Sequence, residues 1–208
     1  MVKEIVELRG GHLKTGIIGT DALVQALPKL GRAEVMYEIA SKTTFPSWGY
    51  GIVHGQTTIA EDFGCSHYYS VSMKMFGSIE KFFYRDVAGI SPRSPGYRTA
   101  TVFPKVPTKL TWAKASVKSI RGTVAVEWRA EEDRFVLLLL VPAGVDADVQ
   151  IPLLDFDIAK ITEGAAVVWA NGEYVDSVPG ISAGENRRDG YVPFWVGSGS
   201  YEFTVRGM

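Results

Sequence analysis

The chain has 208 residues, of which 46% are hydrophobic and 22% charged, a composition typical of a soluble globular protein of one large or two ordinary domains. Its 22 basic and 23 acidic side chains leave a formal net charge of −1, so charge gives no support to binding of nucleic acid or of an acidic membrane. The single cysteine, Cys65, excludes an intramolecular disulfide and a cysteine-based zinc site.

The histidines and the N-terminal residues bear on metal binding, export and membrane insertion. His12, His54 and His67 lack the spacing of a helical metal pair, and we expect neither a metal nor another cofactor. Residues 1–9 carry charges where a signal peptide needs an apolar run, and the longest apolar run, residues 135–141, is too short to span a bilayer. The compartment therefore stays open, with the cytoplasm as the default.

Residues 1–90 have the periodicity of helices. In the first predicted helix Thr20 is the expected N-cap, and Asp21 favours the positive end of the helix dipole. Pro28 is expected to kink or end this helix and Gly31 to stop it. Its apolar face recurs at helical spacing and consists of Leu23, Ala26, Leu27 and Leu30.

Two more helices are predicted in this half. One covers residues 32–42, and the other runs from about residue 70 to residue 88, with Gly89 after it. The apolar spacing of the latter favours a core face over a ligand site, and this face consists of Met75, Ile79, Phe82 and Phe83.

The stretch from Phe45 to Phe63 lies between the last two predicted helices. Its proline and glycines disfavour a regular helix and predict an extended or looped backbone. Aromatic faces beside a carboxylate are typical of sugar sites, where rings stack under the sugar and an acid or base serves the reacting carbon. The alternative is a rigid connection in which Trp48 and Tyr50 fill the core.

After Ile90 the pattern changes to strands. Residues 91–96 form a turn-rich boundary, and residues 123–129 alternate with the period of a half-buried strand. Residues 135–141 are apolar on both faces, which predicts a central strand, and Asn171-Gly172 favours a type I′ turn. Many short strands predict an antiparallel sandwich. The remaining strands are expected at residues 114–120, 148–151, 165–170, 191–196 and 200–205.

Several motifs occur in a recognisable order. They are His12-Leu-Lys-Thr-Gly-Ile-Ile-Gly-Thr20, Thr44-Phe-Pro-Ser-Trp-Gly-Tyr50, Gly55-Gln-Thr-Thr-Ile-Ala-Glu61, Phe76-Gly-Ser-Ile-Glu-Lys-Phe-Phe-Tyr-Arg85 and Gly197-Ser-Gly-Ser-Tyr-Glu-Phe203. Together they resemble the C-terminal part of bacterial α-L-rhamnosidases, glycoside hydrolases with an (α/α)6-barrel catalytic domain. The resemblance implies an α+β chain in two parts. Residues 1–92 are expected to be a partial barrel and residues 93–208 an antiparallel β-sandwich.

The resemblance also implies inverting hydrolysis by two carboxyl groups. The family's base lies in a Thr-Thr-x-Trp-Glu motif, which falls here on residues 57–61, so Glu61 is the expected base. Trp48, Tyr50, His54 and Phe63 are the expected substrate-binding residues. His67 is added to them because it lies close in sequence.

Two positions depart from the family pattern. Where the family has a tryptophan before the glutamate, this chain has Ala60. Where the family has an Asn-His pair before the Phe-Gly-Ser motif, this chain has Ser72-Met73. Methionine cannot donate a strong hydrogen bond to a sugar hydroxyl. Either the substrate differs from plain rhamnose, or the site has diverged from that of the family.

In the family, the general acid and most of the sugar pocket come from a region before the segment that matches here. We therefore expect a C-terminal piece of the enzyme, without hydrolytic activity alone. Its partners are expected to be a rhamnose-containing glycan or glycoside, together with the missing N-terminal part of the barrel or a second copy of the chain. The apolar side chains expected to be left exposed are Met75, Ile79 and Phe83.

Two other functions remain open. The first is a non-catalytic carbohydrate-binding sandwich, with Trp112, Trp128, Trp169 or Trp195 as a stacking platform. The second is a structural or interaction domain without a ligand. Trp128 alternates onto the same face as Val124 and Val126, which favours core over platform.

Overall fold

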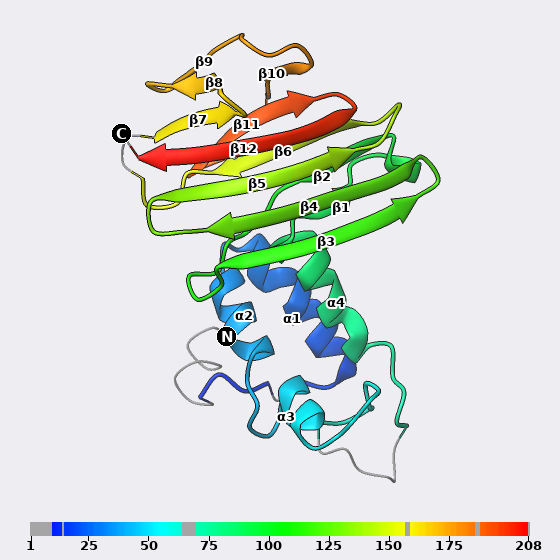
Figure 1. Cartoon of the computed structure of the whole chain (residues 1–208). Helices are drawn as coiled ribbons and strands as arrows, with labels where there is room; N and C mark the ends of the chain where they lie inside the picture. Colours follow the sequence, from blue (N-terminus) through cyan, green and yellow to red (C-terminus); the bar gives the residue numbers. More distant parts are fainter. Residues whose placement is uncertain (1–9, 14, 64–69, 157–158, 186–187, 208) are drawn as a thin grey trace. The chain divides into compact units, whose positions relative to one another are not determined.

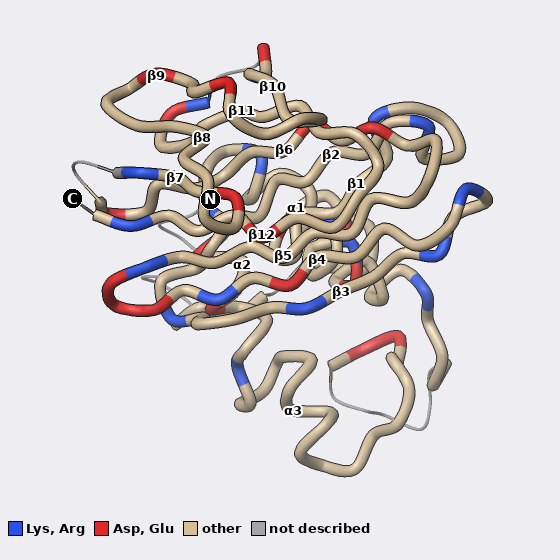
Figure 2. Tube along the Cα trace, turned by 45° about the horizontal axis from the view of Figure 1, so that its top comes forward, with Lys and Arg blue, Asp and Glu red and all other residues tan. Residues whose placement is uncertain are grey.

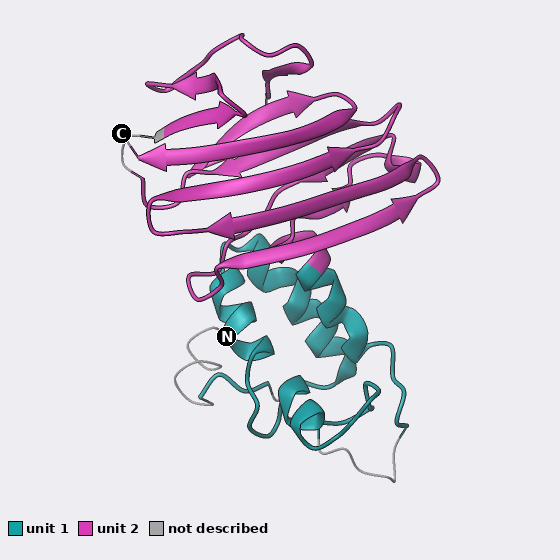
Figure 3. Cartoon of the chain, viewed as in Figure 1, with its two compact units in different colours: residues 1–83 teal, residues 84–208 magenta. Residues whose placement is uncertain are grey.

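The computed structural model describes residues 10–13, 15–63, 70–156, 159–185 and 188–207 (Figure 1). The chain divides into two compact units, residues 1–83 and residues 84–208 (Figure 3). The first is helical and the second consists of β-sheets. Within the described residues, no helix is long and apolar enough to cross a membrane.

The helical unit is built around α1 (Ile17–Lys29), which packs on α2 (Ala33–Ala40) and on the helical turns after residue 75. These turns are a 3₁₀ turn (Phe76–Ser78), α4 (Ile79–Lys81) and a π-helical segment (Phe82–Val87) that continues into the second unit. The fully buried side chains that form this core include Val24, Leu27, Met36 and Phe82.

The ends of α1 give one correction and one confirmation. The helix begins at Ile17 with Gly16 as N-cap, so the expectation that Thr20 is the N-cap was wrong. Thr20 is buried, and its hydroxyl lies 2.8 Å from that of Thr15. At the other end Gly31 has φ +71°, and the N–H of the next residue donates to the carbonyl of Leu27 at 2.8 Å, so Gly31 ends the helix as predicted.

The stretch from Phe45 to Phe63 contains a helix that the sequence argued against. Helix α3 (Trp48–Val53) begins after Ser47, whose Oγ accepts a hydrogen bond from the N–H of Tyr50 at 3.0 Å. Gly49 lies inside this helix, and a Cβ there would be 2.2 Å from the carbonyl oxygen of Lys42. The glycine therefore permits close backbone packing and does not interrupt the helix.

The third predicted helix is shorter than expected. It starts at Phe76 and not near residue 70, because the backbone before it bonds to an earlier loop. Ile79 is 7% exposed, so the expectation that it is left open was wrong. Phe83, at 44% exposed, is open as expected, and Met75 is half-buried.

The second unit is a sandwich of two sheets, as predicted. Neighbouring strands are antiparallel except β2 and β6, which run parallel. The five-stranded sheet has the order β1 (Ile90–Pro92), β2 (Thr99–Val102), β6 (Asp146–Pro152), β11 (Tyr191–Val196) and β10 (Ile181–Ala183). The seven-stranded sheet has the order β3 (Trp112–Ser119), β4 (Gly122–Ala130), β5 (Arg134–Val141), β12 (Gly199–Gly207), β7 (Ala159–Glu163), β8 (Ala166–Ala170) and β9 (Glu173–Tyr174).

Alternation along the strands fills the space between the sheets. The rings of Phe194 on β11 and Phe203 on β12 lie 5.4 Å apart and join the two layers. Strand β5 is central, as expected, since it pairs with both β4 and β12. Only one of its faces is buried, however, because Leu138 and Leu140 are 40% and 42% exposed on the outer face.

Two local predictions in the sandwich are confirmed. Asn171 and Gly172 both have positive φ, at 54° and 84°, as a type I′ turn between β8 and β9 requires. Trp128 is fully buried on the inner face of β4, with Val124 and Val126, and so belongs to the core. A short 3₁₀ turn, Pro95–Tyr97, follows β1 in the turn-rich boundary.

Candidate active site

Three aromatic rings in the helical unit come together around the start of α3. The indole Nε1 of Trp48 donates a hydrogen bond to the carbonyl oxygen of Phe76 at 3.0 Å. The ring of Phe63 lies edge-on to Trp48 at 5.3 Å and tilted against Phe76 at 4.6 Å. The hydrogen bond and the ring contacts fix the Trp48 side chain relative to the chain segment before α4.

These rings line a cavity of about 190 Å³. Typical ligand pockets measure roughly 300–1,000 Å³, so this cavity is small and provides only part of a ligand's surroundings. Besides the three rings, its walls are Ala40, Ser47, Ile52, Gln56, Thr58, Ile59, Ala60, Asp62, Ile79 and Phe83. Sequence reasoning did not assign Phe76, Ile79 or Phe83 to the site, and for Ile79 and Phe83 the reason is that their helical spacing indicated core.

Glu61 is half-buried at the edge of this region, between two cavity-lining neighbours. Its backbone N–H donates to the carbonyl of Ser70 at 2.8 Å, and its Oε2 accepts from the N–H of Ser70 at 3.2 Å. Within the described part of the chain, its Oε1 has no hydrogen-bond partner. Ser70 therefore orients the carboxylate while one oxygen remains available.

The backbone around Glu61 is held by the segment that follows the undescribed residues 64–69. The hydroxyl of Thr58 donates to the carbonyl of Val71, and the N–H of Met73 donates to the carbonyl of Ile59 at 2.6 Å. These bonds place residues 70–73 alongside residues 58–61. Nothing in the local sequence pattern predicted this pairing.

Both departures from the family pattern lie in these two segments. Ala60 is 5% exposed and forms part of the cavity wall, with a smaller side chain than the tryptophan of the family motif. Ser72 is exposed and Met73 is half-buried on the paired segment. The substitutions therefore change the wall of the same small region.

Tyr50 on α3 and His54, the C-cap residue of this helix, form a second pair of rings one helical turn apart. Their rings lie 4.0 Å apart, and Nδ1 of His54 donates to the carbonyl of Tyr50 at 2.8 Å. Neither residue lines the cavity of Trp48 and Phe63. His67 lies outside the described residues. The structure thus pairs Trp48 with Phe63 and Tyr50 with His54, while Glu61 bonds to Ser70.

Among the described residues of the sandwich unit, no exposed tryptophan pairs with another ring to form a stacking platform. Trp128 is fully buried, Trp169 is 8% exposed, and Trp195 lies under the guanidinium of Arg93 at 5.5 Å from the ring centroid. Trp112 is 61% exposed, but in the part of the chain that the structure describes it stacks with no other ring. Across the same residues, no cluster of three His, Cys, Asp or Glu side chains could hold a metal ion.

Comparison with known families matches the helical part and the sandwich part of the chain to two different domains. Residues 1–87 match the bacterial alpha-L-rhamnosidase 6 hairpin glycosidase domain, and residues 89–166 match the bacterial alpha-L-rhamnosidase C-terminal domain. An alpha-L-rhamnosidase of Streptomyces avermitilis is 32% identical over 97% of this chain, and one of Alteromonas sp. is 30% identical over 84% of it. The chain spans only 19% of the length of each of these two relatives.

Solved structures show the same relationship. The alpha-L-rhamnosidase from Dictyoglumus thermophilum aligns with 99% of this chain at 30% identity and a TM-score of 0.87, over 22% of its own length. The Streptomyces avermitilis enzyme, solved in complex with L-rhamnose, aligns with 96% of this chain at 32% identity and a TM-score of 0.78, over 19% of its own length. The chain belongs to the bacterial α-L-rhamnosidase family and corresponds to a C-terminal segment of its members, a helical part followed by a β-sandwich.

Proposed function

We propose that this chain forms the base-bearing part of an inverting α-L-rhamnosidase-like hydrolase that removes terminal α-L-rhamnosyl or related residues from a glycan or glycoside. The main observation in support is the position of the Glu61 carboxylate beside an aromatic cavity. Its Oε2 accepts a hydrogen bond from the N–H of Ser70 at 3.2 Å. Glu61 also occupies the glutamate position of the motif at residues 57–61.

In this proposal Glu61 acts as the general base. An inverting enzyme uses one carboxylate to take a proton from water as that water attacks the anomeric carbon, while a second carboxylic acid protonates the leaving oxygen. The two groups lie about 6.5–9.5 Å apart in such enzymes, which leaves room for the water. Oε2 of Glu61 is bonded to Ser70, so Oε1 is the oxygen that takes the proton. We assign the general acid to the part of the relatives that this chain does not match.

The aromatic residues would bind the sugar. Trp48 and Phe63 form an apolar wall against which a sugar ring can stack, while Tyr50 and His54 supply polar groups from α3. A role for His67 stays a prediction. With Ala60, Ser72 and Met73 at these positions, the site has a smaller wall residue and fewer donors, which would let it accept residues related to rhamnose as well as rhamnose itself.

The proposal is tested by grafting. The 208-residue chain replaces the matching segment of the Streptomyces avermitilis enzyme, and hydrolysis of an aryl α-L-rhamnoside is compared for the chain and the graft. The chain alone should show no measurable turnover, because general acid help is worth about 10²–10⁴-fold and positioning of the substrate about as much again. The graft should be active. Robust hydrolysis by the chain alone, or a folded but inactive graft, would contradict the proposal.

A further inference from the structure

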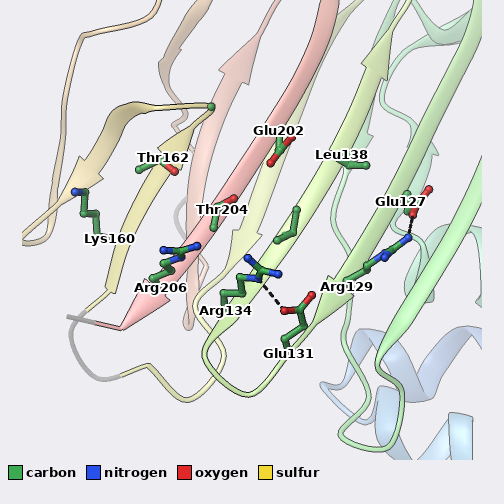
Figure 4. A pocket seen from close by; sticks show the side chains of 12 residues that line it. Glu127, Arg129, Glu131, Arg134, Leu138, Lys160, Thr162, Glu202, Thr204 and Arg206 are labelled. Atoms are coloured by element: carbon green, nitrogen blue, oxygen red, sulfur yellow. Dashed lines mark hydrogen bonds and ion pairs between the residues drawn. The ribbon is translucent and has the colours of Figure 1, made fainter.

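A row of three cationic side chains crosses the outer face of the seven-stranded sheet. Arg206 on β12 is directly opposite Arg134 on β5 and directly opposite Lys160 on β7. Strand alternation puts all three on the solvent side, because their neighbours Phe135, Val205 and Ile161 are fully buried. Figure 4 shows the three side chains in a line across neighbouring strands, and Figure 2 shows basic segments at this end of the sheet beside the acidic β4–β5 turn.

This arrangement is unfavourable in the free protein. Directly opposite residues have Cβ atoms only about 4.5–5.5 Å apart, and like charges at that distance repel. Glu131 compensates Arg134, with which it forms an ion pair at 2.8 Å. Lys160 and Arg206 have no ion-pair partner within the residues that the structure describes. An anion bound between them would relieve the repulsion.

The row forms one side of a hollow of about 680 Å³, within the usual size range of ligand sites of about 300–1,000 Å³. The next residues on β12 and β7, Thr204 and Thr162, are directly opposite each other and both line the hollow. Glu202 follows on β12 and lines it further from the row. Two hydroxyls and a carboxylate next to a cationic row match a ligand that carries one acidic group and several hydroxyls.

We propose that this hollow binds a carboxylate-bearing sugar unit of an acidic glycan. Its carboxylate lies between Arg206 and Lys160, and its hydroxyls bond to Thr162, Thr204 and Glu202. The planar guanidinium of Arg206 fits a carboxylate with two parallel hydrogen bonds, and the Lys160 ammonium adds a point charge. The site lies wholly on the sandwich and does not depend on the role of Glu61.

The charge of the hollow limits the ligand to a weakly anionic one. Four cationic side chains and three carboxylates line it, which leaves one net positive charge. Ion pairs already occupy Arg129, with Glu127 at 2.9 Å, and Arg134. Nucleic acids and densely sulfated glycans carry a higher charge density, and the carboxylates of the hollow would repel them. A glycan with one carboxylate per sugar fits this balance.

The test is calorimetric titration of the whole 208-residue chain with a galacturonic acid trisaccharide at low ionic strength. We expect saturable binding, and a dissociation constant raised at least about tenfold in Arg206→Gln and in Lys160→Gln, through loss of a charge-assisted hydrogen bond. Lys160→Arg should retain binding. Lys118→Gln, which removes an exposed charge from β3 outside the hollow, is the matched control and should leave binding unchanged.

Three comparisons make the result decisive. The methyl ester of the same trisaccharide should lose binding because it lacks the charge, and acetate should bind far more weakly because it lacks the hydroxyls. The thermal midpoints of Arg206→Gln and Lys160→Gln should equal or exceed that of the parent, because repulsion is removed. Absence of saturable binding, equal binding of the ester, an equal loss in Lys118→Gln, or tighter binding of a heparin oligosaccharide or of single-stranded DNA would overturn the proposal.

Discussion

The indole Nε1 of Trp128 donates a hydrogen bond of 2.8 Å to the carbonyl oxygen of Val87, and the Trp128 side chain is fully buried. The bond ties the end of the π-helical segment to the inner face of β4. The ring of Phe135 on the neighbouring strand lies 6.0 Å from the indole. Trp128 therefore fills the sandwich core and also satisfies a buried backbone acceptor.

Replacement of Trp128 by phenylalanine removes both the donor and part of the core volume. We expect the free energy of unfolding of the sandwich to fall by about 1–3 kcal/mol, because a buried acceptor loses its partner. Denaturant unfolding followed by circular dichroism measures this loss. Trp112→Phe, at a position 61% exposed, is the matched control and should change stability by less than about 0.5 kcal/mol. Equal stability of the two variants would contradict the role of the Trp128 bond.

Gly49→Ala tests the close approach inside α3. The added Cβ would lie 2.2 Å from the carbonyl oxygen of Lys42, so the backbone must shift, at a cost of about 1–3 kcal/mol for an overpacked site. The control is Gly77→Ala, whose Cβ meets only a side-chain atom of Ile59 at 3.9 Å. We expect thermal unfolding of the helical unit at a lower temperature for Gly49→Ala and little change for Gly77→Ala. A neutral Gly49→Ala would show that the helix does not need the glycine.

The environment of the Tyr191 phenol leads us to expect that the protein loses stability at alkaline pH. Burial raises the pKa of its phenol to about 12, although Arg188 nearby lowers it, and the hydroxyl donates to the carbonyl of Pro104 at 3.2 Å. The unfolded state, with an ordinary phenol pKa of about 10, releases its proton first as the pH rises, so the unfolded state binds fewer protons and stability falls. The contribution is complete below about pH 10 and is lost as the pH approaches 12.

Tyr191→Phe removes this titrating group. The difference in unfolding free energy between about pH 9 and about pH 11.5 should therefore be smaller in the variant than in the parent. An identical pH dependence in the two proteins would contradict the burial of the phenol.

Exposed apolar side chains on the helical unit predict self-association. Ile18, Leu30, Ile52 and Val53 are 73%, 67%, 71% and 60% exposed, and large open apolar patches are rare on monomers. We expect sedimentation velocity at micromolar concentration to show association that rises with concentration. Replacing Ile52 and Val53 with glutamine should weaken it, while Ile120→Gln on the sandwich, at a position 89% exposed, should not. A monomer at every concentration would contradict this expectation.

The sequence predicts best where the signal is local. The alternation in β4, the end of α1 at Gly31 and the Asn171-Gly172 turn all depend on neighbouring residues, and each is confirmed. Strands β1, β2, β7, β9 and β10 were not predicted, because they are short. In addition, β2 and β7 form through pairing with strands that are distant in the chain, β6 and β12. Helix α3 was excluded because Gly49 was interpreted from local propensity, whereas its role is contact with Lys42.

The same limit applies to the candidate site. Trp48 and Phe63 belong to one stretch that the sequence already singled out, and their rings are in contact. The partners that complete the region, Ser70 and Phe76, come from later in the chain and could be found only through long-range hydrogen bonds. Periodicity and spacing in the sequence reveal local structure and do not reveal such bonds.

The central claim is that Glu61 activates the attacking water. The most direct measurement is the kinetics of Glu61→Gln in an intact α-L-rhamnosidase that carries this segment, with Glu80→Gln on the exposed side of α4 as the matched control. We predict a fall in kcat of about 10²–10⁴-fold for Glu61→Gln with little change in KM, because the substitution removes proton abstraction and leaves sugar binding in place. Glu80→Gln should retain full turnover. An unchanged kcat in Glu61→Gln would contradict the account.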